Sequence, residues 1–177
     1  MKEKMSVPEL ENCLSGMVLL VDTREQENFG FKRRMEKIPC AKRREKLTSG
    51  DYSAECVLPD GSVYSIKDKV AIERKMSLDE ICANFCAGRE RFIKEFERFV
   101  GAGGKLYILI ENASWEKVCG GMYETKMNKD ALMASLLAWG ARYNTQFIFC
   151  DSFISPAMIY KILYFELREH LKKEAGE

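Results

Sequence analysis

The sequence contains one histidine, His170, among 177 residues. Catalysis by a histidine base would therefore depend on a single side chain in the charged stretch ELREHLKKEAGE, which disfavours that class of enzyme. The seven cysteines are odd in number and lie 27, 16, 26, 4, 33 and 31 residues apart, so they match neither a disulfide framework nor a zinc pattern. Cys82 and Cys86 alone are close, and we interpret them as small buried residues one helical turn apart. The spacing favours a reducing compartment.

Long apolar runs are also missing. No stretch approaches the roughly 18 uninterrupted apolar residues of a membrane span, and the opening residues MKEKMSVPELENC lack an apolar signal core. We therefore expect no membrane partner and a cytoplasmic or nucleoid-associated protein that is not secreted. The segment GAGGK (101–105) lacks the spacing of a phosphate loop, so we expect a helix-to-strand loop there and no nucleotide cofactor.

The chain does have enough apolar residues, 46% against 31% charged, to form a core. Its net charge is only +1, but the charge is unevenly spread. Eight basic and two acidic residues lie between Lys32 and Lys46, a local charge of +6, which leaves −5 on the other 162 residues. We call residues 32–46 the basic stretch.

Periodicity predicts an α/β protein with a mixed sheet flanked by helices. The run MVLLV (17–21) is typical of a buried strand with Asp22 at its end, and alternation in TSGDYSAECV, VYSI and KVAIERK predicts a β-meander. A charged segment with helical character lies between Asp22 and Cys40, and helical spacing recurs over 77–100, broken near Gly88, with capping-box spacing at Ser77 and Glu80. The remaining sequence predicts a strand at KLYILIE, a helix at NKDALMASLLAWGARY, a strand at QFIFC and a last helix that begins at Ser155 and Pro156.

Charged residues capable of catalysis gather at the predicted strand ends and turns of the first half. They are Asp22, Glu25, Asp51, Glu73 and Lys75. Converging carboxylates repel one another unless a hard cation lies between them, and oxygen ligands suit Mg²⁺ or Mn²⁺. Alternate residues of a strand share a face, so Glu73 and Lys75 should point together while Arg74 points away. The lysine suggests an anionic substrate.

The Glu-x-Lys tripeptide alone is weak support, because it recurs by chance at Glu124 and Lys126. The first copy differs in its context. It follows the apolar strand residues VAI and a Gly-Asp turn, whereas the second lies in a polar loop.

Four segments in this order, VDTREQ, LTSGDY, AIERKMSLDE and AGRERF, resemble the nuclease domain of the XPF-type structure-specific endonucleases. The family pattern GDx(n)ERKx(3)D is matched by Gly50, Asp51, Glu73, Arg74, Lys75 and Asp79, and the upstream Asp-x-Arg-Glu by Asp22, Arg24 and Glu25. The resemblance covers residues 18–111 well and the later helices in outline. It implies a restriction-endonuclease-like fold and metal-dependent hydrolysis of phosphodiester bonds in DNA.

The resemblance also implies roles for individual residues. Asp51, Glu73 and Asp22 would hold one or two cations that activate a water, and Lys75 would stabilise charge on the phosphate. Arg74 would hold the acidic groups or a phosphate, and Asp79 would be an outer-shell ligand or favour the dipole of its helix. Arg24 and Glu25 would form a supporting ion pair, or Glu25 would reach the metal.

Several basic residues are candidates for binding DNA. The resemblance points to Arg24, Arg89 and Arg91, while clustering and alternation within the basic stretch point to Lys32, Arg33, Arg34, Lys42 and Arg44. A solvated charged face is the alternative for each.

We expect one nuclease domain over residues 1–177, with its core at 17–150 and a C-terminal helix at 155–173. Family members usually carry helix-hairpin-helix repeats, and many carry a helicase region, but we expect neither in these residues.

The resemblance implies a homodimer, and the last helix is apolar on most sides, at Met158, Tyr160, Ile162, Leu163, Tyr164 and Phe165. The expected substrate is branched, flap or fork DNA in repair or recombination. The alternatives are an inactive DNA-binding scaffold, or a junction resolvase or exonuclease of the same superfold.

Overall fold

The apolar run after Gly16 forms strand β1 (Val18–Asp22), and Asp22 is its last residue, as predicted. The structure, a computed structural model, describes residues 5–174. These residues form two units, one containing the chain up to Val70 together with Pro156 onward, and the other containing Ala71–Ser155. The assignment of residues 1–177 to one domain stays a prediction.

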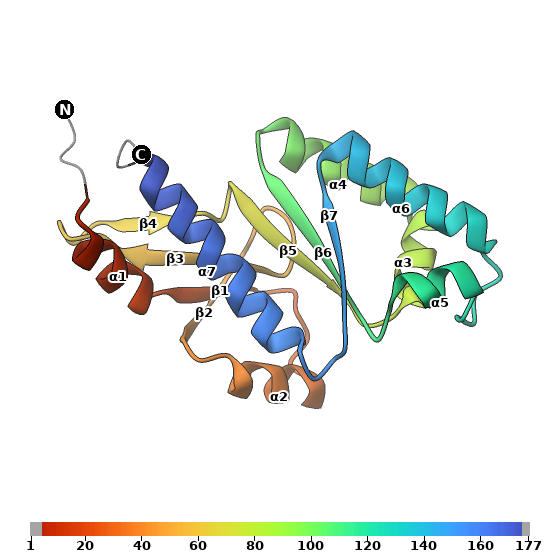
Figure 1. Ribbon diagram of the computed structural model, residues 1–177, viewed down its shortest axis with the longest axis horizontal. Helices are drawn as coiled ribbons and strands as arrows, with labels where there is room; N and C mark the ends of the chain where they lie inside the picture. Colours follow the sequence, from red (N-terminus) through yellow and green to blue (C-terminus); the bar gives the residue numbers. More distant parts are fainter. Residues whose placement is uncertain (1–4, 175–177) are drawn as a thin grey trace. The chain divides into compact units, whose positions relative to one another are not determined.

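The first unit has a sheet of mixed direction. β1 pairs parallel with β2 (Ala41–Glu45) and antiparallel with β3 (Tyr52–Val57), so that Val21 lies opposite both Arg44 and Tyr52. β4 (Val63–Ser65) pairs antiparallel with β3. The unit also contains α1 (Val7–Ser15), α2 (Phe29–Lys37) and nearly all of α7 (Ser155–Glu174) (Figure 1).

The predicted β-meander is correct for β3 and β4 but wrong beyond them, because β4 pairs with β3 alone among the described strands. After β4 the chain turns tightly. Ile66 N donates to Ala54 O at 3.0 Å, and Val70 N donates to Ile66 O at 2.7 Å. These bonds close a turn between β4 and β5 (Val70–Lys75). In a meander β5 would instead pair with β4.

The second unit packs helices against strands β5, β6 (Lys105–Glu111) and β7 (Gln146–Cys150), with β6 and β7 parallel. Its helices are α3 (Leu78–Phe85), α4 (Arg89–Gly101), α5 (Trp115–Gly120) and α6 (Lys129–Tyr143), which gather along one side of β6 and β7 (Figure 1). Gly88 is the N-cap of α4, so the predicted break is confirmed. GAGGK is the expected helix-to-strand loop, since α4 ends at Gly101 and β6 begins at Lys105.

An aromatic cluster fills the core of the second unit. Trp139 lies 5.0 Å from the ring centres of Phe85 and Phe92 and 4.9 Å from that of Phe96, mostly edge to face. Alternate residues of β6, Leu106, Ile108 and Ile110, belong to the same buried cluster. The apolar residues that recur at helical spacing and those that alternate along β6 thus pack together in one core.

The predicted fold class, α/β with a mixed sheet flanked by helices, is confirmed. Two helices were not predicted, α1 and α5. α1 begins with a capping box in which Ser6 and Glu9 cap each other's backbone. Among the helices of residues 5–174, none combines the length and apolar content that a membrane span requires.

Candidate active site

Asp22 is a buried carboxylate whose two oxygens are fully engaged. Its Oδ1 accepts hydrogen bonds from the backbone N and the Nε of Arg24, both at 2.7 Å. Its Oδ2 accepts from Leu47 N at 2.7 Å and from an Arg24 terminal nitrogen at 3.2 Å. Burial opposes the ionisation of Asp22, but these hydrogen bonds outweigh burial and hold its pKa below the ordinary value. Asp22 therefore ties the end of β1 to the segment that leads into β3.

Asp51 lies opposite Asp22 at the same end of this strand pair. Asp22 N donates to Asp51 O at 2.8 Å, which continues the antiparallel register of β1 and β3 by one residue. Gly50, immediately before it, is buried and has a φ of 72°, a left-handed conformation that costs glycine little. The Gly-Asp pair of the sequence motif is thus a turn that delivers Asp51, which is partly exposed, to the start of β3.

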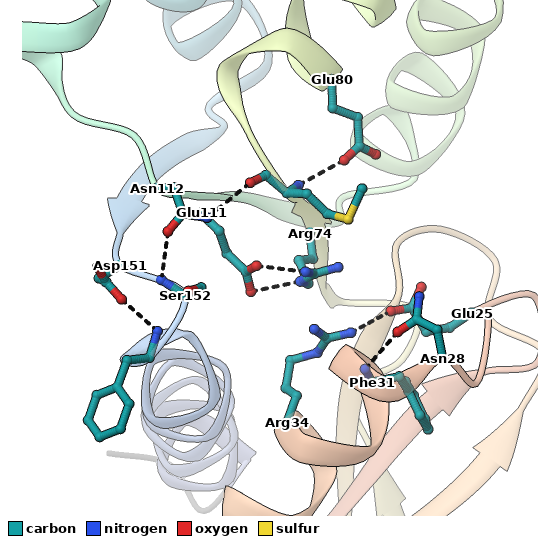
Figure 2. Close-up of polar contacts among 12 residues, drawn as sticks. Glu25, Asn28, Phe31, Arg34, Arg74, Glu80, Glu111, Asn112, Asp151 and Ser152 are labelled. Carbon is teal, nitrogen blue, oxygen red and sulfur yellow. Dashed lines mark hydrogen bonds and ion pairs between the residues drawn. The ribbon is translucent and has the colours of Figure 1, made fainter. Parts of the chain in front are cut away.

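The expected ion pair between Arg24 and Glu25 is wrong. Arg24 pairs with Asp22, and Glu25 pairs with Arg34 of α2, with 2.8 Å between Arg34 Nη2 and Glu25 Oε1 (Figure 2). The reason is that the Arg24 side chain folds back along the turn and binds the carboxylate of Asp22, two residues earlier.

Glu73 and Lys75 share a face of β5, as their alternation predicts. Lys75 Nζ donates to Glu73 Oε1 at 2.6 Å and lies 3.6 Å from a Glu80 carboxylate oxygen. Lys75 is buried, and its Nζ lies 5.6 Å from the ring centre of Phe92. Burial raises the pKa of Glu73, against the opposing effect of Lys75. The pair is a poorly solvated carboxylate and ammonium, so it responds strongly to any charge placed beside it.

Arg74 points to a residue that the sequence interpretation missed. Its Nε and one terminal nitrogen donate to the two carboxylate oxygens of Glu111, at 2.7 and 2.6 Å (Figure 2). Glu111 is the last residue of β6 and is buried. The only available signal was a charged residue ending an apolar strand, the same signal that singled out Asp22.

Asp79, in the first turn of α3, binds the backbone of the loop that contains Glu124 and Thr125. Its Oδ1 accepts from the backbone N of Glu124 and of Thr125, both at 2.8 Å. The capping box is half formed, since Glu80 N donates to Ser77 Oγ while the Glu80 carboxylate accepts from Met76 N. These bonds fix the start of α3 directly after β5.

The candidate DNA-binding residues differ in exposure. Seven of the eight residues proposed for the role are exposed: Arg24, Lys32, Arg33, Lys42, Arg44, Arg89 and Arg91. Arg34 is the exception, with 6% of its surface exposed. Lys42 also donates to Ile38 O at 2.7 Å, so its ammonium is partly engaged.

The candidate residues fall into two groups, one in each unit. Asp22, Arg24, Glu25 and Asp51 belong to the first unit, and Glu73, Arg74, Lys75 and Asp79 belong to the second. Within residues 5–174, no cluster of three or more His, Cys, Asp or Glu side chains is arranged to hold a metal ion. The donor chemistry of both groups, carboxylate oxygens, fits Mg²⁺ or Mn²⁺. The fit is better for Asp51 and Glu73 than for Asp22, whose oxygens accept four hydrogen bonds already.

Comparisons with known proteins agree with this fold. Solved structures of XPF from Aeropyrum pernix, alone and in complex with DNA, match with TM-scores of 0.60 and 0.59. Both are 16% identical over 86% of this chain, which covers 69% and 66% of the two matched chains. Among curated proteins, none matches. The solved structures establish the fold as that of an XPF nuclease domain.

The family model of the ERCC4 domain matches residues 21–163, most of the chain and both groups of candidate residues. The chain therefore belongs to the ERCC4 domain family, a family of DNA nucleases.

The Asp22 network predicts a specific dependence of stability on pH. Because the folded state lowers the pKa of Asp22, its ionisation stabilises the fold above the unfolded-state pKa of about 4, and this contribution is lost as the pH falls through the folded-state value. Asp22→Asn should cost about 1–3 kcal/mol at pH 7 and flatten the loss of stability on acidification, measured by thermal unfolding between pH 7 and pH 2. Asp130→Asn, at an exposed site, is the control. A D22N melting profile parallel to that of the wild type would contradict the assignment.

Proposed function

We propose that this chain is a divalent-metal-dependent DNA endonuclease that hydrolyses phosphodiester bonds in branched, flap or fork DNA during repair or recombination. Membership of the ERCC4 domain family supports the reaction class. The observation that carries the proposal is the intact motif, with the Glu73–Lys75 pair at 2.6 Å on one face of β5 and Gly50 in the left-handed turn before Asp51. The fold match to an XPF that was solved in complex with DNA supports DNA as the partner.

The cation in this proposal is Mg²⁺ or Mn²⁺, for which the carboxylates of Asp51 and of Glu73 are each candidate ligands, and it would lower the pKa of a bound water and offset charge on the phosphate. Lys75 supplies a donor and a positive charge to the developing oxyanion. Asp22, Asp79 and Arg74 act through the contacts described above, because each fixes a backbone segment or a neighbouring carboxylate. We propose that cleavage requires both groups of residues.

The decisive experiment is incubation of the protein with labelled duplex, 3′-flap, fork, four-way-junction and single-stranded DNA in Mg²⁺, followed by mapping of the cuts. Internal cuts near a branch point support the proposal. Selective cutting of the four-way junction would identify a resolvase, and stepwise loss from an end would identify an exonuclease. Binding without cleavage would identify a scaffold module.

The motif predicts which substitutions abolish cleavage. Asp51→Asn, Glu73→Gln and Lys75→Ala should each reduce the rate about a hundredfold to a thousandfold while DNA binding persists, because each removes charge from the reacting centre. In the two carboxamide variants, binding should hold or tighten as repulsion from phosphates is relieved. Single-turnover cleavage and fluorescence anisotropy measure the two effects.

The second Glu-x-Lys tripeptide provides the matched controls. Glu124→Gln and Lys126→Ala, both exposed, should cut at near wild-type rates. If these variants were inactive and the first set active, the active site would be wrongly placed.

The exposed part of the basic stretch is proposed to contact DNA phosphates. Reversing Lys32 and Arg33 to Glu should weaken binding of all sequences alike and reduce the slope of log affinity against log salt by about two, one for each phosphate that is no longer neutralised. The same reversal at the exposed Lys126 and Lys129 is the control. A salt slope unchanged by Lys32→Glu and Arg33→Glu would identify a solvated face instead.

We also propose a homodimer that uses α7. Of its apolar residues, Leu163 is buried in its own unit, but Phe165 is half exposed and lines a groove of about 520 Å³ between α1 and α7 with Val7 and Leu10. Covering Phe165 favours association. Sedimentation at about 50 μM, a concentration at which a small interface should still populate the dimer, should show a dimer that Phe165→Glu converts to monomer. A wild-type monomer at that concentration would contradict this proposal.

A further inference from the structure

Arg34 and Lys75 are the two buried basic residues among residues 5–174, and Arg34 is the one that belongs to the basic stretch. It is 6% exposed, whereas Lys32 and Arg33 beside it in α2 are exposed. Arginine is rarely buried without a partner. Arg34 donates through Nη2 to Glu25 Oε1 at 2.8 Å (Figure 2), and through Nε to the hydroxyl of Tyr52 at 3.0 Å.

Tyr52 closes the network into a triangle. Its hydroxyl donates to the same Glu25 oxygen, Oε1, at 3.1 Å. Tyr52 is the residue after Asp51 and is fully buried, and burial raises its pKa, so the hydroxyl keeps its proton and remains a donor. The guanidinium of Arg34 also lies 5.9 Å from the ring centre of Tyr52.

One oxygen of Glu25 therefore receives both donors. Within residues 5–174, the contacts to the Glu25 side chain all fall on Oε1, and Oε2 accepts no hydrogen bond from the chain. Glu25 retains partial exposure, with 17% of its side-chain surface accessible. A carboxylate fixed through one oxygen leaves the other to accept a cation or a water that a cation holds.

Arg44 holds the backbone of the same segment. From β2 it donates through Nη2 to the carbonyl oxygens of Thr23 at 3.0 Å and of Glu25 at 2.8 Å. Its guanidinium lies 5.4 Å from the ring centre of Phe31, and that of Arg34 lies 5.9 Å from the same ring. Two arginines on separate elements thus fix both the backbone and the side chain of Glu25.

We propose that Arg34, Tyr52 and Arg44 are positioning residues of the nuclease, which orient Glu25 so that its Oε2 faces the divalent cation or its water. This inference rests on the proposed function. It assigns two arginines of the basic stretch to the active site instead of to DNA phosphates. Groups that orient metal ligands typically change metal affinity or activity by about 10- to 100-fold when they are removed.

The test compares Arg34→Met, Arg34→Lys, Tyr52→Phe and Arg44→Met in the full chain. The measurements are Mn²⁺ affinity by titration calorimetry without DNA, DNA affinity by anisotropy, and kcat and KM for cleavage. Arg34→Met should weaken Mn²⁺ binding and lower kcat about 10- to 100-fold while DNA affinity stays within about twofold. Arg34→Lys should recover part of the loss, and Tyr52→Phe and Arg44→Met should lose less than Arg34→Met. Arg142→Met, at an exposed arginine of α6, should leave every measurement unchanged.

The outcomes separate this inference from the function it rests on. Unchanged Mn²⁺ affinity in Arg34→Met and Tyr52→Phe, or a loss confined to DNA affinity, would overturn the positioning role. A wild type that binds Mn²⁺ but does not cut DNA would overturn the proposed function, and the Mn²⁺ affinities would still decide the role of Arg34. A wild type that neither binds Mn²⁺ nor cuts overturns both. If Arg34→Met fails to fold, by circular dichroism, then Tyr52→Phe, which removes one oxygen atom, decides alone.

Discussion

A charge placed out of water must be paired or hydrogen-bonded, and the buried carboxylate of Asp22 shows how far that constraint organises the first unit. The sequence places an acid at the end of an apolar strand, where it is only 1% exposed. The chain must then bring N–H groups to it, and it does so by folding Arg24 back and by drawing in Leu47 from 25 residues away. The turn after β1 and the approach to Gly50 and Asp51 thereby become fixed together. The need to hydrogen-bond the buried carboxylate of Asp22 thus also positions Asp51, a candidate metal ligand. Asp22 contacts Asp51 through its backbone N–H and not through its side chain.

The same constraint recurs in both units as an arginine, buried or largely buried, that pairs with a carboxylate. In the first unit Arg34 binds Glu25, and in the second Arg74 binds Glu111 through two parallel hydrogen bonds. Such pairs add little net stability, because desolvation offsets most of the attraction, but their geometry is strict. They suit a site in which carboxylates must stay ionised and oriented. Replacing either arginine would remove the hydrogen bonds that orient its carboxylate, so we expect these pairs to matter more for the position of the carboxylate than for the stability of the fold.

Periodicity was enough to predict much of this structure. A continuous apolar run located β1, alternation located β3 and β5, and helical spacing located α4, α6 and α7. The two-residue period of a strand predicted that Glu73 and Lys75 would meet. The site was predictable where its contacts are local in sequence. The contacts of Arg34 with Tyr52 and of Arg74 with Glu111 span 18 and 37 residues and depend on how separate elements pack. No local pattern distinguishes Arg34 from Arg33. The meander failed for the same reason, since the turn at Ile66 depends on a hydrogen bond to Ala54 in another strand.

The basic stretch shows why charge density alone is an incomplete guide to nucleic-acid binding. Its local charge is +6, but its side chains point in different directions and have different partners. Lys32 and Arg33 face solvent, where a phosphate can replace water at little cost, whereas Arg34 and Arg44 already donate to Glu25 and its backbone. For both arginines, binding a phosphate would require giving up these hydrogen bonds, and those of the buried Arg34 are made in a partly dehydrated setting, where they are stronger than in water. Existing hydrogen bonds therefore separate the roles of these cations: Lys32 and Arg33 remain available to DNA, whereas Arg34 and Arg44 hold the side chain and the backbone of Glu25 in place.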